Sequence, residues 1–175
     1  FYLFFVDKKY VSGKDFMNGR EVAAPFQETP ADIQILRDTS NYRVFEVSGN
    51  LSSARASYFH KSLGGYHAAK PRRIQQLFDY QIAKNNIEVL DFLNVKYIIQ
   101  TDKEGKEFPT VNPNANGNAW FVSQIKTVSS ADEEMKALDK FDSKNVAIVN
   151  TKEFTIQNKN FVKDASAVIT LDDYK

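Results

Sequence analysis

The residue types best suited to binding chemistry lie between Glu46 and Asp79. No acidic side chain occurs between these two positions, but both histidines of the chain and five cationic residues do: Arg55, His60, Lys61, His67, Lys70, Arg72 and Arg73. The formal net charge of the whole chain is only +1, so this concentration of positive charge is local. It predicts a basic patch suited to an anionic group such as a phosphate or a carboxylate.

A helix start lies at the end of this basic segment. Pro71 is typical of the first helical position, so Arg72 and Arg73 fall in the first turn, where the helix dipole is already positive. The preceding residues, 68–70, are Ala, Ala and Lys, which cannot cap the exposed N–H groups. An uncapped helix start with two cations is a suitable seat for an anion, and Gly64-Gly65 would allow a close backbone approach.

The candidate substrate or anion-binding residues are His60, Lys61, Tyr66, His67, Lys70, Arg72 and Arg73. An alternative stays open: the cations form a solvated face neutralised by Asp79 or Glu88, and Gly64-Gly65 serves only a turn. Arg72 and Arg73 would then have no ligand.

Other chemistry is less well supported. The two histidines have no nearby carboxylate or cysteine to complete a metal site, so no metal is predicted. The sequence contains no nucleophile elbow and no Gly-rich phosphate loop, and therefore no catalytic residue and no cofactor is predicted. The absence of cysteine excludes disulfides and thiolate chemistry, and the balanced charge argues against a nucleic-acid partner. Trp120, the single tryptophan, is expected in the core.

Helix and strand signals alternate along the chain. Helices are predicted at 30–37, from 71 to about 82, at 85–93 and at 130–141, and strands at 42–48, 95–100, 119–128, 146–149, 154–156 and 167–171. The polar stretch 101–118 is predicted to be a long loop. This order favours an α/β or α+β fold, a mixed β-sheet with several short helices packed on it.

Three helix starts are predicted from capping patterns. Thr29-Pro30 begins the first helix, which should bury Ile33 and Leu36. Asn85 with Glu88, and Ser130 with Glu133, have the spacing of capping boxes.

The ends of the chain favour a piece of a larger protein. The first residue is not Met, and the apolar run Phe1–Val6 is far shorter than the ~20 residues that cross a bilayer, so it is predicted to be a buried first strand. A predicted strand at 167–171 stands only four residues before the end of the chain. We expect a single domain over residues 1–175, cut from a larger protein.

Three stretches carry a family resemblance. They are SYFHKSLGGYHAAK at 57–70, LDFLNVKYII at 90–99 and NPNANGNAWFV at 112–122. In this order and spacing they resemble the large extracytoplasmic region of the YfhO family of bacterial multi-pass membrane proteins, and 6–10 and 41–44 fit the same pattern.

That resemblance implies a location and a role. YfhO-family members are similar to lipid-linked-sugar glycosyltransferases of the C-type fold, whose catalytic carboxylate lies in loops between membrane helices. The chain would then face away from the cytoplasm at the bacterial cell membrane, beside the membrane-embedded portion of the same polypeptide. The resemblance also implies that the chain is cut before a following β-rich portion. It would contribute to recognition of a lipid-linked sugar or a cell-envelope glycopolymer without being catalytic by itself. The alternative is a non-catalytic interaction module that docks an envelope protein or polymer.

Overall fold

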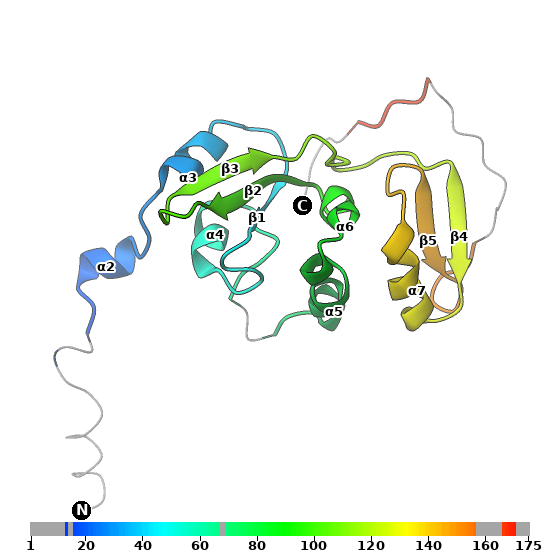
Figure 1. Cartoon of the computed structure of the whole chain (residues 1–175), viewed down its shortest axis with the longest axis horizontal. Coiled ribbons are helices and arrows are strands. Elements are labelled where there is room, and N and C mark those ends of the chain that lie inside the picture. The colour runs from blue at the N-terminus through cyan, green and yellow to red at the C-terminus, as the bar shows by residue number, and fades with distance from the viewer. Residues whose placement is uncertain (1–12, 14–15, 67–68, 157–165, 171–175) are drawn as a thin grey trace, which may run out of the picture.

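The computed structural model describes residue 13 and residues 16–66, 69–156 and 166–170 (Figure 1). Its helices are α2 (Gly19–Ala23), α3 (Pro30–Ile35), α4 (Ala54–Phe59), α5 (Arg72–Tyr80), α6 (Ile87–Phe92) and α7 (Ala131–Ala137), with short 3₁₀ turns η2 (Ile82–Lys84) and η3 (Leu138–Lys140). Its strands are β1 (Arg43–Glu46), β2 (Val95–Thr101), β3 (Glu107–Val111), β4 (Gln124–Val128) and β5 (Val146–Asn150). The predicted mixed sheet with several short helices is confirmed, as an α+β arrangement with two sheets.

Sheet A consists of β1, β2 and β3 in that order. β1 runs parallel to β2, and β3 runs antiparallel to it. Successive strand residues point to opposite faces, and both faces of β1 are covered. Val44 packs with Ile35 and Ile99 on one face, whereas Phe45 belongs to the cluster formed with the α5–α6 region on the other. Sheet A is therefore a central layer between α3 and the α5–α6 pair.

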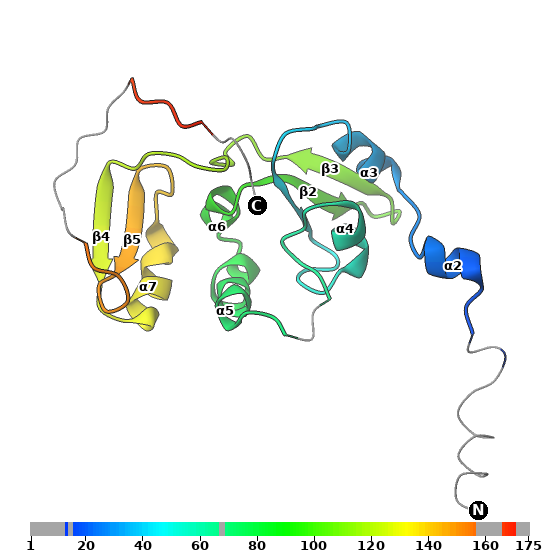
Figure 2. The ribbon, with the colours of Figure 1, turned by 180° about the vertical axis from the view of Figure 1, so that it is seen from behind.

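Sheet B is the parallel pair β4 and β5, connected through α7. Figure 2 shows α5 and α6 lying between sheet A and this β4–α7–β5 unit. The contacts that join the two parts include polar side chains of the α5–α6 connection. The buried Gln81 donates to the Met135 carbonyl at 2.8 Å, and Asn86 donates to the Leu138 carbonyl at 2.8 Å. The Phe92 and Phe141 rings meet edge to face beside them.

The predicted loop 101–118 is wrong in part, because it contains β3. The chain turns back at Gly105, whose φ of +82° is readily adopted by glycine. The Asp102 carboxylate accepts hydrogen bonds from the backbone N–H groups of Glu104 and Lys106 and holds this turn. β3 can then pair with β2 although it contains a proline, since it is an edge strand.

The first predicted helix is confirmed, but its predicted buried face is wrong. Thr29 and Asp32 form the capping box of α3. Ile33 and Leu36 are 46% and 45% exposed, while Asp32 and Ile35 are fully buried. Asp32 points inward because its partners Arg55 and His60 lie there, and the apolar pattern of the sequence does not show these partners.

The predicted Asn85–Glu88 capping box is also wrong. Asn85 ends η2 in the left-handed conformation, with φ of 62°, and Asn86 precedes α6 without a side-chain cap. The Asn86 amide donates instead to Gln81 and Leu138, and Glu88 accepts from the Ser143 backbone at 3.1 Å. The side chains of Asn86 and Glu88 are therefore engaged in tertiary contacts and do not cap α6. The Ser130 cap of α7 is confirmed, since its hydroxyl accepts from the Glu133 N–H.

The predicted strands differ most toward the end of the chain. Strands β1, β2 and β5 confirm three predictions. Pairing in 119–128 begins only at Gln124, and residues 154–156 and 167–170 form no strand. Before β4, the Trp120 indole N–H donates a hydrogen bond to the Ser143 carbonyl at 2.8 Å. The predicted strand at Phe1–Val6 and residue 171 lie outside the described ranges. No helix in those ranges has the length and hydropathy needed to cross a membrane.

We expect Asn86→Ala to lower the free energy of unfolding by about 1–3 kcal/mol, because it leaves buried acceptors on Gln81 and Leu138 without a donor. Thermal or urea unfolding measures the change. Asn114→Ala, at an exposed position, is the matched control and should shift stability by less than about 0.5 kcal/mol. Equal shifts in the two variants would show that the Asn86 bonds do not contribute.

Candidate functional site

The structure does not bring the predicted basic residues together on one ligand. The His60 side chain is 1% exposed, and its Nε2 lies 2.8 Å from Asp32 Oδ1. Lys61 donates to the Asn41 amide oxygen at 2.8 Å, and Lys70 donates to the Leu51 carbonyl at 3.0 Å. Three of the candidates are therefore engaged by the protein itself.

The remaining candidates lie elsewhere. Tyr66 is 82% exposed, and His67 lies outside the described residues. Arg73 Nη2 is 2.5 Å from Glu153 Oε2 and 4.0 Å from Glu134 Oε2, and this pairing raises the pKa of its guanidinium. Arg72 is exposed and forms no ion pair within the described residues.

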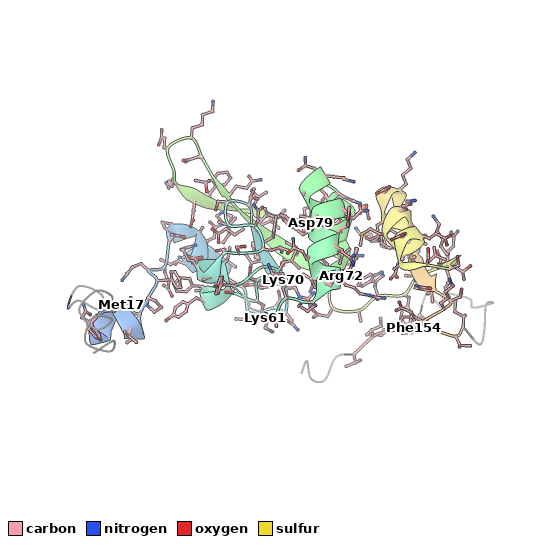
Figure 3. All side chains as sticks on the ribbon, turned by 90° about the horizontal axis from the view of Figure 1, so that it is seen from below. Met17, Lys61, Lys70, Arg72, Asp79 and Phe154 are labelled. Carbon is pink, nitrogen blue, oxygen red and sulfur yellow. The ribbon has the colours of Figure 1, made fainter. Side chains whose placement is uncertain are left out.

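The helix start at Pro71 is uncapped, as predicted: α5 has no side-chain cap. Figure 3 shows Arg72 at the start of α5 and Asp79 further along the same helix. Asp79 accepts from Gln75, and Glu88 accepts from the Ser143 backbone. The predicted neutralising role of Asp79 and Glu88 is therefore wrong for Arg73, which is paired with Glu134 and Glu153.

A buried charge cluster is built on Asp32. This fully buried carboxylate accepts from the Thr29 backbone at 2.7 Å and from the Thr29 hydroxyl at 2.8 Å. Its Oδ2 also meets Arg55 Nη2, and Oδ1 faces His60. Burial alone would raise the pKa of Asp32, but the hydrogen bonds from Thr29 and His60 and the Arg55 charge outweigh it, and the pKa is lowered.

The Asp32 cluster serves the fold. It joins the N-terminus of α3 to α4, and Arg55 extends it to Glu107 of β3 at 3.1 Å. A His–Asp pair can act as a base, but His60 is too well covered for a substrate to reach it. Within the described residues, no group of three or more His, Asp or Glu side chains could hold a metal ion.

An apolar cleft of ligand size lies between α5 and α7, and we call it the α5–α7 cleft. Its volume of about 490 Å³ lies in the range of small-molecule pockets. The walls are mainly apolar and include Leu77, Phe92, Trp120, Met135, Leu138 and Phe141. The charged residues of the lining are Arg73 and Glu134.

The sequence indicated these side chains without indicating the cleft. Ile74 and Leu77 have the spacing of an apolar helix face, and so do Met135 and Leu138. In the structure these apolar faces of α5 and α7 line the same cleft, and no residue of α5 is fully buried. Trp120, expected in the core, lines the same cleft.

Comparison with known proteins identifies no relative: no family model, no curated protein and no solved structure matches this chain.

We expect Asp32→Asn to cost about 2–4 kcal/mol at pH 7, because it leaves Arg55 and His60 buried without their carboxylate. The folded pKa of Asp32 is lowered, so its contribution is present above the unfolded value of about 4 and is lost as the pH falls through the folded value. Denaturant unfolding at pH 2–7 should show the two proteins converging in acid. The exposed Asp79→Asn serves as control, and a pH-independent difference would contradict this assignment.

Gly64→Ala is expected to destabilise the fold by about 1–3 kcal/mol. A Cβ at Gly64 would lie 2.4 Å from the Asn50 carbonyl oxygen and 3.0 Å from the Leu51 Cα, and backbone cannot move aside as a side chain can. Gly64 thus approaches the protein's own chain closely. Gly19→Ala, whose Cβ would meet open space, should be neutral or slightly stabilising in the same thermal melts.

Proposed function

We propose that this chain is a binding module of a bacterial multi-pass membrane protein, on the extracytoplasmic side of the cell membrane, and that the α5–α7 cleft is its ligand site. The membrane context is proposed from the resemblance to the YfhO family. The cleft is the observation that supports a binding role, because it combines ligand-sized volume with apolar walls from both halves of the molecule.

The cleft is suited to the apolar part of a ligand. Burial of apolar surface contributes about 25 cal/mol per Å², so a chain that buries about 200 Å² gains about 5 kcal/mol before the costs of association. The Arg73 charge is already compensated by Glu153 and Glu134. Affinity would therefore come mainly from burial.

The first candidate ligand is a lipid-linked sugar, as the resemblance implies. Its polyprenyl chain would occupy the cleft, and its phosphate would face Arg72 at the exposed start of α5. The membrane-embedded portion of the same polypeptide would hold the rest of the donor. A cell-envelope glycopolymer lacks the apolar chain and is supported less by this cleft.

The second candidate is the docking of an envelope protein. One observation favours it: strand β5 lines the cleft with consecutive residues, and so offers backbone as well as side chains.

Trp120 provides the test, because it is the single tryptophan of the chain and lines the cleft. Its fluorescence should change saturably when a polyprenyl phosphate in detergent micelles, or an apolar peptide, is added to the protein. Leu77→Arg, which places a charge in the cleft, should weaken either response at least tenfold. The matched control is Ile87→Arg on α6, an exposed position outside the cleft.

Two further comparisons complete this experiment. Arg72→Gln should weaken binding of the polyprenyl phosphate but not of the neutral polyprenol, if the phosphate faces α5. If Trp120 fluorescence responds to neither lipid nor peptide, the cleft is not a ligand site. The same conclusion holds if the Leu77→Arg variant responds as strongly as the parent protein.

A further inference from the structure

The α5–α7 cleft meets strand β5 along its edge. Val146, Ala147 and Ile148 all line the cleft, although neighbouring side chains of a strand point to opposite faces. Three consecutive residues of a strand can line one cleft if the cleft lies against the edge of the strand, where the backbone of each residue is exposed. Figures 1 and 2 agree with this, since β5 lies on the α5–α6 side of sheet B and β4 lies on the outer side.

The hydrogen-bond pattern identifies the backbone groups at this edge. The Asn145 carbonyl accepts from Gln124 N at 3.0 Å, and Thr151 N donates to the Val128 carbonyl at 2.9 Å. The odd-numbered residues of β5 therefore direct their backbone N–H and C=O groups toward β4. Val146 and Ile148 direct theirs to the opposite side, away from β4. The Val146 N–H is bonded to the Asp142 carbonyl, but the N–H and C=O of Ile148 have no hydrogen-bond partner within the described residues.

These open groups select the chemistry of an occupant. An extended polypeptide presents N–H and C=O groups that match both open groups of Ile148 in register, which a lipid chain cannot do. Sheet B has two parallel strands, whereas parallel sheets usually have more strands and both faces covered. A further strand would continue the existing β4–β5 ladder.

We infer that the β5 edge binds an extended apolar segment of a partner protein, which becomes the third strand of sheet B. The edge opens into a cleft walled by α5, which admits a single extended segment more readily than the β5 edge of a second copy, because that edge carries its own α5. A segment of about five residues would match β5. Walls such as Leu77 and Leu138 favour apolar side chains on the incoming strand. This inference rests on the proposed function, because the strand occupies the same cleft.

The test uses proline as a probe of one N–H. Ile148→Pro removes the N–H that faces the cleft and leaves the β4–β5 ladder intact, because Ile148 does not bond to β4. Ile125→Pro is the matched control: by the same register, its N–H points away from β5, on the outer edge of β4. Ile148→Val keeps the N–H and controls for the changed side chain.

The ligands are a blocked octapeptide of alternating Val and Ile with a Lys at each end, its fully N-methylated copy, and a polyprenyl phosphate in micelles. Trp120 fluorescence should show binding of the octapeptide, and binding at least tenfold weaker for Ile148→Pro and for the N-methylated copy. Ile125→Pro and Ile148→Val should bind like the parent protein. Hydrogen exchange in the parent protein adds a measurement free of folding effects, since the Ile148 amide should become protected when the octapeptide binds.

Each other outcome is decisive. Equal octapeptide affinity in Ile148→Pro and Ile125→Pro, or no added protection at Ile148, overturns the strand-addition inference. Binding of the polyprenyl phosphate alone also overturns it but leaves the proposed cleft function standing. If no ligand binds, the inference and the proposed function both fail.

Discussion

The buried carboxylate of Asp32 is the interaction on which sheet A and its helices depend. One side chain caps α3, receives Arg55 of α4 and faces His60 beyond the end of α4. A carboxylate without these partners would be too costly to bury, so the three contacts must form together. This requirement fixes which face of α3 points inward, and it withdraws the side chains of Arg55 and His60 from the surface. The basic segment therefore contributes much of its charge to internal structure.

The second half of the molecule is attached by a different kind of contact. Gln81 and Asn86 bond to carbonyl groups of α7 and η3, and Phe92 meets Phe141, so specific contacts hold sheet B beside α5. These contacts position the two walls without closing the space between them. Apolar side chains of α5 and α7 consequently border a cleft, where a complete core would have buried them. The proposed binding role follows from this incomplete closure and from the open edge of β5.

Local signals predicted local structure well. The Thr29 capping box, the Ser130 cap and the uncapped start of α5 depend on residues within a few positions of one another. Predictions failed where a distant partner competes for a side chain, as Leu138 does for Asn86. The stretch 167–170 has the composition of a strand but is not paired within the described residues, and β propensity requires a neighbouring strand to take effect.

The sequence alone determined the fold class and most helix and strand positions, and it predicted a set of anion-binding residues. It also carries the family resemblance, which no comparison with known proteins supports or opposes. Only the tertiary structure decided what those residues do: His60 faces Asp32 from 28 positions away, and Arg73 pairs with Glu153 from 80 positions away. The α5–α7 cleft likewise draws its walls from segments far apart in the chain. Charge and polarity can be read from a sequence, but which groups satisfy one another depends on distances that only folding sets.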